Sequence, residues 1–256
     1  MVIPRDILRT NKCLNDWAIL IGWRGSIAHG MYIPSDDPKS IDDKDVMGIC
    51  VPPIEYYYGL EHFGSRGTQE IKRQEWDIVV YELLKFVSLL EKGNPNVLSL
   101  LWLKPNHYIK TTPEGLLLVE NRSLFVGKHV YHSFAGYAHG QLHRMTHQAY
   151  RGYMGEKRRA LVDAHGFDTK NAAHLIRLLR MAIEFLGDGE LRVEREDAAQ
   201  LLQIKRGEWN LESVKIEATR LFQLAEEAYV RSKLPAKLDR KAINSLCVGI
   251  IATRHT

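Results

Sequence analysis

The pattern of apolar residues changes near residue 110, and this change constrains the fold more than any other feature of the sequence. Before it, apolar runs of strand length at residues 18 to 23, 46 to 51 and 76 to 81 alternate with segments rich in Gly, Pro and Asp. From about residue 112, apolar residues recur at helical spacing with few prolines. The sequence therefore predicts an α+β fold, with a mixed α/β domain over residues 1 to 110 and an all-helical domain over residues 111 to 256.

Local signals mark the ends of several expected helices. Gly93-Asn94-Pro95 ends a helix over residues 82 to 91 and begins the next, because Pro fits a first helical turn that Asn caps. Asp168-Thr169 is a capping signal before a helix over residues 168 to 186. Residues 151 to 159 resemble a basic loop. Further helices are expected at residues 113 to 120, 129 to 150, 196 to 207 and 211 to 232.

The composition is that of an ordinary globular protein. Hydrophobic residues make up 45% of the 256 residues and charged residues 26%, which excludes a long disordered chain, a collagen-like chain and a coiled-coil rod. The three widely spaced cysteines suggest neither a disulfide framework nor a cysteine zinc site. Charged residues interrupt the first twenty positions, and no stretch reaches the roughly 18 to 20 apolar residues of a membrane span. We expect a soluble cytoplasmic protein with no membrane partner and leave its oligomeric state open.

The positive charge is concentrated in one segment. The net charge is +4 overall, but residues 128 to 180 hold nine Lys and Arg against three Asp and Glu, a formal charge of +6. The same segment contains seven of the eleven histidines. Such a segment is either an anion-binding surface or an ordinary solvated face.

Three aspartates lie at the expected strand ends. Asp43 and Asp45 precede and enter the second apolar run, where the two-residue period of a strand puts both on one face with Lys44 pointing away. Asp77 enters the third run as its one polar side chain. Adjacent carboxylates repel one another, and a divalent cation between them relieves this repulsion.

A Gly-Ser pair follows the first expected strand. Gly25 permits close approach of the backbone to a phosphate, and the Ser26 hydroxyl can donate to its oxygens. With Asp43, Asp45 and Asp77, this loop forms a plausible site for two Mg²⁺ ions and a nucleoside triphosphate (NTP), an arrangement suited to in-line displacement. The alternative is that Gly25-Ser26 is only a turn and that the aspartates are solvated loop acids, helix caps or an exposed strand end.

These segments resemble the DNA polymerase beta superfamily of nucleotidyltransferases, and most closely its branch associated with RNA ligases and RNA repair. The resemblance extends over roughly residues 15 to 210. It rests on Gly25-Ser26-Ile27-Ala28-His29-Gly30, Asp43-Lys44-Asp45-Val46-Met47-Gly48, Trp76-Asp77-Ile78, Gly93-Asn94-Pro95-Asn96 and residues 166 to 180.

The resemblance implies a minimal nucleotidyltransferase fold, a short mixed sheet with flanking helices, that depends on Mg²⁺ (or Mn²⁺). It implies that Asp43 and Asp45 bind both metals, that Asp77 binds the catalytic metal and activates the acceptor hydroxyl, and that Gly25-Ser26 holds the triphosphate. The sequence departs from the family pattern at two points. Sixteen residues separate Ser26 from Asp43, so that Asp36, Asp37 or Asp42 could replace a ligand, and Ser99 stands where a glutamate is frequent.

A row of cations is expected on the helix that begins at Asp168. Lys170, His174 and Arg177 lie at positions i, i+4 and i+7, which places them on one face opposite much of the apolar set. This face would suit the β and γ phosphates of a nucleotide or an RNA backbone, and otherwise it is a solvated helix face. Further residues that could extend the surface are Arg144, Tyr150, Arg151, Tyr153, Lys157, Arg158 and Arg159.

His139, His143 and His147 share one helical face and raise the alternative of a zinc site. Arg144 stands where a metalloprotease motif has its glutamate base, so we expect these histidines to be ordinary polar groups instead.

The predicted activity is transfer of a nucleoside monophosphate from an NTP to an acceptor hydroxyl on RNA. Two alternatives remain. One is transfer to a protein or a small molecule, and the other is a non-catalytic nucleotide-binding or RNA-binding module.

Overall fold

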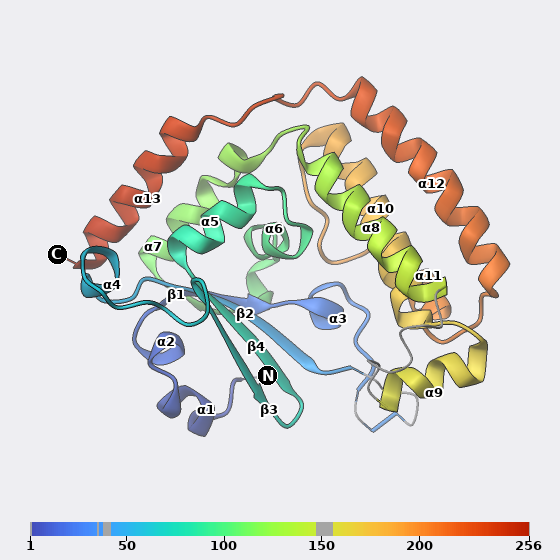
Figure 1. Ribbon diagram of the computed structural model, residues 1–256, viewed down its shortest axis with the longest axis horizontal. Coiled ribbons are helices and arrows are strands. Elements are labelled where there is room, and N and C mark those ends of the chain that lie inside the picture. The colour runs from blue at the N-terminus through green and yellow to red at the C-terminus, as the bar shows by residue number, and fades with distance from the viewer. Residues whose placement is uncertain (1, 35, 38–41, 147–155, 256) are drawn as a thin grey trace.

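The computed structural model describes residues 2–34, 36–37, 42–146 and 156–255. Figure 1 shows a mixed β-sheet with helices on both sides at one end of the molecule and a group of long helices at the other. The sheet has the order β3-β4-β2-β1-β5. Its strands are β1 (Ala18–Trp23), β2 (Lys44–Cys50), β3 (Thr68–Arg73), β4 (Trp76–Glu82) and β5 (Tyr108–Thr111). The predicted α+β class is confirmed.

The centre of the sheet is built from the three predicted apolar runs. Every residue of β1 is buried, and β2 is buried from Val46 onward. β2 pairs with β1 in antiparallel orientation and with β4 in parallel orientation. The parallel register aligns Asp45 with Asp77. The two strands therefore present these carboxylates side by side at one end of the sheet.

Short helices surround the strands. In Figure 1, α5 (Leu83–Glu91), α6 (Pro95–Leu101) and α7 (Pro113–Glu120) lie above the sheet, and α1 (Arg5–Thr10) and α2 (Lys12–Asn15) lie below it. The Asn94 side chain caps α6 by accepting from the amides of Asn96 and Val97, with Pro95 in the first turn as predicted. The remaining short elements are α3 (Gly25–Ala28), α4 (Glu55–Tyr58) and the 3-10 turns Pro105–His107 and Arg122–Phe125.

The second half is helical, with α10 (Thr169–Asp188) at its centre. This helix packs against α8 (Val130–Thr146), α11 (Ala198–Lys205) and α12 (Leu211–Arg231). Asp168 caps it as predicted, since Oδ1 accepts from the Asn171 amide at 2.9 Å. Gly189 ends it with a φ of 79°, a left-handed conformation that glycine adopts without strain.

Two helices differ from the sequence-based expectation. The expected basic loop over residues 151 to 159 is helical from residue 156, where α9 (Glu156–His165) begins. Its short, highly charged sequence lacks a clear apolar stripe, so helical periodicity did not predict it. The C-terminal helix α13 (Arg240–His255) was not predicted, and it returns across the molecule to pack against α7 (Figure 1).

The two halves share one hydrophobic core. The same cluster of buried side chains runs from Ile3 in the N-terminal segment to Ile250 in α13. Trp102, just after α6, packs edge to face on Phe185 of α10 with 5.7 Å between ring centroids. In the part of the chain that the structure describes, no helix combines the length and the apolar character needed to cross a membrane.

Phe185→Ala tests how strongly this core depends on α10. Phe185 is fully buried, so its truncation should lower the free energy of unfolding by about 3 to 5 kcal/mol, measured by urea denaturation. Val230→Ala on the exposed side of α12 is the control and should change it by less than about 0.5 kcal/mol. A loss below about 1 kcal/mol for Phe185→Ala would contradict the packing described.

Candidate active site

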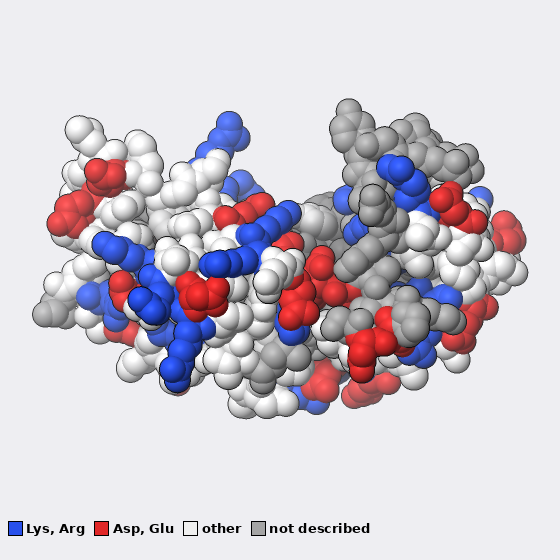
Figure 2. Space-filling view, turned by 90° about the horizontal axis from the view of Figure 1, so that it is seen from below, with Lys and Arg blue, Asp and Glu red and all other residues white. Residues whose placement is uncertain are grey.

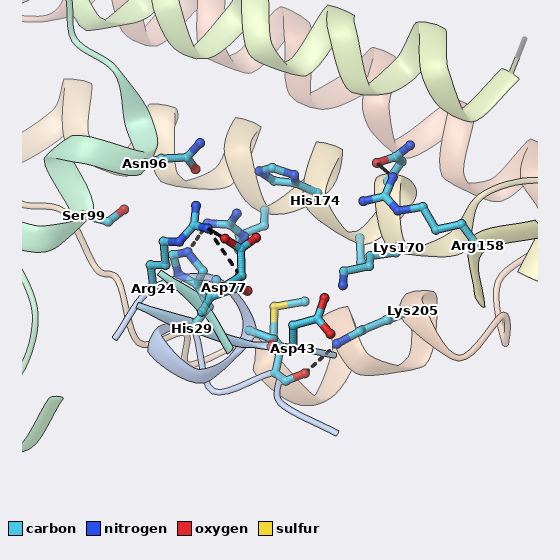
Figure 3. A pocket seen from close by; sticks show the side chains of 17 residues that line it. Arg24, His29, Asp43, Asp77, Asn96, Ser99, Arg158, Lys170, His174 and Lys205 are labelled. Carbon is cyan, nitrogen blue, oxygen red and sulfur yellow. Dashed lines mark hydrogen bonds and ion pairs between the residues drawn. The ribbon is translucent and has the colours of Figure 1, made fainter. Parts of the chain in front are cut away.

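A pocket of about 340 Å³ lies between the end of the sheet and α10. Figure 3 shows its side chains converging from both halves of the molecule. All eight site residues singled out from the sequence line it, namely Gly25, Ser26, Asp43, Asp45, Asp77, Lys170, His174 and Arg177. The structure therefore gathers into one cavity residues that are up to 152 positions apart in the chain.

The carboxylates form one wall of this pocket. Asp45 and Asp77 lie at the same register of neighbouring parallel strands, and Asp43 comes immediately before β2. The Arg24 guanidinium lies between the first two, with Nη2 3.2 Å from Asp77 Oδ1 and 3.6 Å from Asp45 Oδ1 (Figure 3). Arg24 was not predicted as a site residue from the sequence, although its position between β1 and Gly25 indicated that it lies beside the expected phosphate-binding turn.

The Asp45 carboxyl is electrostatically unfavourable in its charged form. Burial raises its pKa to about 6, and the like charges of Asp77 and Asp43 act in the same direction against the cations Arg24 and Lys170. Arg24 and Lys170 together therefore do not offset the effect of burial on Asp45.

The Gly25-Ser26 turn is fitted closely against Asp45. Gly25 has a φ of +60°, and a Cβ added there would lie 2.2 Å from Asp45 Oδ2, so the position accepts only glycine without rearrangement. The Ser26 hydroxyl faces the same pocket and is buried without a hydrogen-bond partner among the described residues. An unpaired buried hydroxyl in a cavity can receive or donate a hydrogen bond when a ligand enters.

Arg177 is a buried cation of the opposite wall. Its Nη1 lies 2.5 Å from His29 Nε2, and His29 Nδ1 lies 2.7 Å from the Val193 carbonyl, so Nδ1 donates and Nε2 accepts. Burial, followed by the charge of Arg177, holds the pKa of His29 well below its ordinary value, which keeps this ring neutral. Burial and the neighbouring Arg195 lower the pKa of Arg177 to about 9. The guanidinium therefore remains charged at pH 7, and no ion pair with a carboxylate is found for it within the described residues.

Lys170 and His174 lie beside Arg177 on α10, as their helical spacing predicted. Lys170 Nζ is 3.3 Å from Asp42 Oδ1. Burial, with the charges of Arg177 and other nearby cations, holds the pKa of His174 well below its usual range. The neutral His174 has a buried Nε2 with no hydrogen-bond partner among the described residues. Its free ring nitrogen and the Ser26 hydroxyl are two unsatisfied groups in one cavity.

Arg158, named from the sequence as a possible extension of the cationic surface, also lines the pocket, as do Lys205 and Asn96, which were not assigned to the site from the sequence. Arg158 Nη1 is 3.3 Å from the capping Asp168, which ties α9 to the start of α10. Lys205 forms a buried ion pair with Asp42 and donates to the Met31 carbonyl at 2.9 Å.

The three alternative ligands lie away from the pocket lining. Asp42 is buried against Lys205 and Lys170 and accepts from the Ile33 amide. Burial pushes the pKa of Asp42 up, but these contacts outweigh burial and lower it. Asp37 lies 3.8 Å from Arg206, and Asp36 is exposed.

The basic segment does not form one uniform cationic surface. Arg177 is buried, and Arg180 forms ion pairs with Asp197 and Glu217 at 2.7 and 3.1 Å. Arg144 and Arg159 are exposed. The side chains of Tyr150, Arg151, Tyr153 and Lys157 lie outside the described residues.

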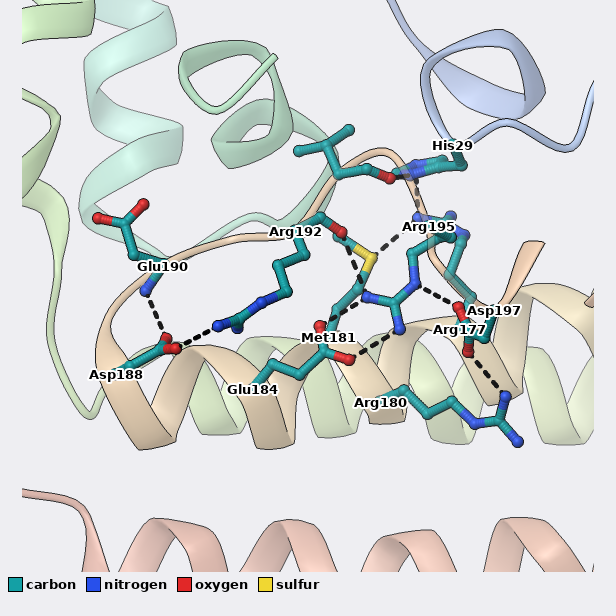
Figure 4. Close-up of polar contacts among 11 residues, drawn as sticks. His29, Arg177, Arg180, Met181, Glu184, Asp188, Glu190, Arg192, Arg195 and Asp197 are labelled. Carbon is teal, nitrogen blue, oxygen red and sulfur yellow. Dashed lines mark hydrogen bonds and ion pairs between the residues drawn. The ribbon is translucent and has the colours of Figure 1, made fainter. Parts of the chain in front are cut away.

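A second polar network lies next to the pocket residues His29 and Arg177 (Figure 4). Arg195 is buried and binds Glu184 of α10 through both Nη atoms, at 2.6 and 2.8 Å, and Asp197 through Nε at 2.8 Å. These contacts hold the segment after α10 against the helix. Val193, which accepts from His29, lies in that segment.

The zinc alternative finds no support in the described part of this helix. His139 stacks on Phe222 with 4.3 Å between ring centroids, and His147 lies outside the described residues. Within residues 2–34, 36–37, 42–146 and 156–255, no three His, Cys, Asp or Glu side chains stand close enough together to hold a metal ion as they are.

The carboxylate wall nevertheless fits Mg²⁺ or Mn²⁺ by its chemistry. Asp43, Asp45 and Asp77 supply only oxygen donors, which these hard cations prefer. They line one cavity, in which burial and the like charges of Asp77 and Asp43 raise the pKa of Asp45 and so disfavour its charged form. A divalent cation would supply compensating positive charge.

The close fit of Gly25 can be tested by Gly25→Ala. The added methyl group must displace Asp45, and the alanine must also adopt a left-handed backbone conformation. Gly166→Ala is the control, because it introduces the same kind of backbone strain at φ +80° with no atom within 4 Å of the new methyl group. Urea denaturation should show that Gly25→Ala costs about 1 to 3 kcal/mol more than this control. Equal losses would mean that Asp45 does not confine the turn.

With divalent cations removed by EDTA, the raised pKa of Asp45 predicts that ionisation of this carboxyl lowers the free energy of unfolding. The folded state holds the Asp45 proton more tightly than the unfolded state. The destabilisation is therefore absent below about pH 4 and develops as the pH rises through about 6. At pH 7, Asp45→Asn should be about 1 to 3 kcal/mol more stable than the wild type by denaturation. Asp36→Asn is the control, and parallel pH profiles for Asp45→Asn and the wild type would refute the assignment.

Comparison with known proteins agrees with this geometry. No curated protein in the search matches the chain. A family profile described as the RNA repair pathway DNA polymerase beta family (RlaP) matches residues 18–248, which include every residue of the pocket. The chain belongs to this RNA repair pathway branch of the DNA polymerase beta family.

Proposed function

We propose that this protein is a Mg²⁺-dependent nucleotidyltransferase that moves a nucleoside monophosphate from an NTP to a hydroxyl group of RNA and releases pyrophosphate. The observation that carries the proposal is the composition of the pocket. Three carboxylates at the end of the sheet and the cationic residues of α10 line one cavity, and Gly25-Ser26 lines the same cavity. This combination matches a substrate that brings both phosphates and metal ions.

The carboxylate wall would hold the metals. Asp43 and Asp45 would bind both ions, and Asp77 would bind the one nearest the acceptor hydroxyl; that all three line one pocket supports this assignment. When bound, the metals would lower the pKa of the attacking hydroxyl and neutralise charge on the leaving pyrophosphate. The protein contributes by fixing the carboxylates on paired strands, so that little reorganisation is needed when the substrate arrives.

The helical wall would hold the triphosphate. Arg177 is a buried cation whose Nη1 contacts are a neutral histidine and the Met181 sulfur, so an anionic phosphate would supply the negative charge that its surroundings lack. Lys170 lies on the same helix face, and Ser26 and His174 offer the unpaired groups described above. Positive charge fixed here would stabilise the pyrophosphate as it leaves.

A surface outside the pocket supports RNA as the acceptor. Figure 2 shows Lys and Arg side chains gathered on the half of this face that holds the sheet. Exposed basic residues of α1, α2 and β3 belong to this half, namely Arg5, Arg9, Lys12, Lys72 and Arg73, of which Arg73 pairs with Asp6 at 3.2 Å. Lys72 is aligned with Asp77 across the β3–β4 ladder, so the basic surface reaches the carboxylate wall. A phosphate backbone bound there would lead an RNA end toward the pocket.

Loss of a carboxylate tests the activity. Purified protein with α-labelled NTPs, Mg²⁺ and short RNAs should label the RNA, and Asp43→Ala or Asp45→Ala should reduce labelling at least about 100-fold. Asp36→Ala, in the same loop but outside the pocket, is the matched control and should retain activity.

The acceptor is identified by the same assay. Labelling of added protein or of the enzyme itself, without RNA, would assign a different acceptor and refute RNA. Salt-sensitive RNA binding with no transfer, unchanged in Asp43→Ala, Asp45→Ala and Asp77→Ala, would refute catalysis altogether.

A further inference from the structure

Arg24 occupies an unusual position for a positive charge. Its backbone amide donates to the Asp45 carbonyl at 3.0 Å, which continues the β1–β2 ladder by one residue and fixes where the side chain starts. From there its Nη2 reaches Asp77 at 3.2 Å and Asp45 at 3.6 Å. The guanidinium thus stands at the carboxylates that are assigned to the metals.

The contact is weak for an arginine with two carboxylate partners. Arginine pairs best through two parallel N–H groups at 2.7 to 2.9 Å, whereas here one nitrogen is shared at longer distances. Arg24 Nε is buried and has no hydrogen-bond partner among the described residues. The side chain is therefore placed by charge and leaves a buried donor unsatisfied, so its displacement would break few good hydrogen bonds.

We propose that Arg24 is a built-in counter-ion of the metal site. It partly offsets the charge of Asp45 and Asp77 in the metal-free protein, competes with an entering divalent cation for the same oxygens, and is displaced toward the phosphates of the bound nucleotide. The inference rests on the metal site of the proposed function. It adds that the site is regulated by an internal cation.

Charge supplies the physical reason. A carboxylate oxygen that coordinates a metal gives up its contact with a guanidinium on the same side, and two cations a few ångströms apart repel one another. The affinity of the protein for a divalent cation then includes the cost of moving Arg24. By reciprocity, a bound cation weakens the hold of Asp45 and Asp77 on Arg24 by the same factor.

An ordinary structural ion pair would behave differently from a competitor. A structural pair holds Asp45 and Asp77 in place, so its removal would loosen the carboxylates and weaken metal binding. A competitor, when removed, leaves the carboxylates freer for the metal and strengthens binding. The direction of the change in metal affinity separates the two.

The test compares Arg24→Gln with Lys44→Gln. Lys44 precedes Asp45 on β2 but points away from it and pairs with Glu75 at 2.5 Å, so its removal deletes one nearby charge without touching the carboxylate contact. Mn²⁺ affinity is measured from free Mn²⁺ by electron paramagnetic resonance. It is also measured from the fluorescence of Trp23 and Trp76, whose rings lie 5.8 Å apart beside Arg24 and Asp77.

We expect Arg24→Gln to bind Mn²⁺ roughly tenfold more tightly than the wild type, and Lys44→Gln to stay within about twofold. Unchanged or weaker Mn²⁺ binding by Arg24→Gln would overturn the inference. An equal increase in Mn²⁺ affinity in both variants would also overturn it, because it would show a general effect of removing one positive charge. Neither result depends on transfer activity. A protein that shows the tenfold change but transfers no nucleotide would refute the proposed function and leave this inference standing.

A measurement on the wild type covers the case in which Arg24→Gln does not fold. The Arg24 Nε–H signal in a nitrogen NMR spectrum, assigned by its loss in Arg24→Lys, should move when Mg²⁺ is added, because the guanidinium leaves its carboxylate partners. A signal unaffected by saturating Mg²⁺ would overturn the inference.

Discussion

The repulsion between Asp45 and Asp77 is the constraint that organises the rest of this structure. Parallel pairing of β2 with β4 puts the two half-buried carboxylates at one register, where partial burial and the like charge of Asp77 both raise the pKa of Asp45. Positive groups therefore surround them. Arg24 contacts them from the sheet, and Lys170 acts from α10 across the cavity. The cationic wall is needed for the fold to tolerate its own carboxylates, as well as for any bound phosphate.

Buried polar contacts connect the sheet half of the protein to the helical half next to the pocket. Lys205 of α11 bonds to Asp42 and to the Met31 carbonyl, so the segment between α3 and β2 is held by the helical half. His29 is held in the same way by Arg177 and the Val193 carbonyl. Such groups are costly to leave unpaired inside a protein, so each pair favours one relative placement of the sheet and α10.

The sequence allowed part of this arrangement to be predicted. Periodicity located β1, β2 and β4, and capping signals located α6 and α10, because both depend on neighbours in the chain. β3 and β5 were missed, since they are short, partly exposed strands with polar sequences. Motif order and helical spacing singled out eight residues that the structure places in one pocket lining. Arg24, His29 and Lys205 were not among them, because their roles depend on the tertiary fold, in which His29 meets Arg177 from 148 positions away.

The continuous core also limits how the pocket can open. Ile3, Trp102 and Phe185 belong to the same buried cluster, so a hinge motion that separates the sheet from α10 would expose apolar surface at roughly 25 cal/mol for each Å². Rotation of a side chain at the rim, such as Arg24, exposes almost none. The low-energy route into this site is therefore a rearrangement of side chains within a rigid frame, and substrate access follows the timescale of rotamer changes more closely than that of domain movement.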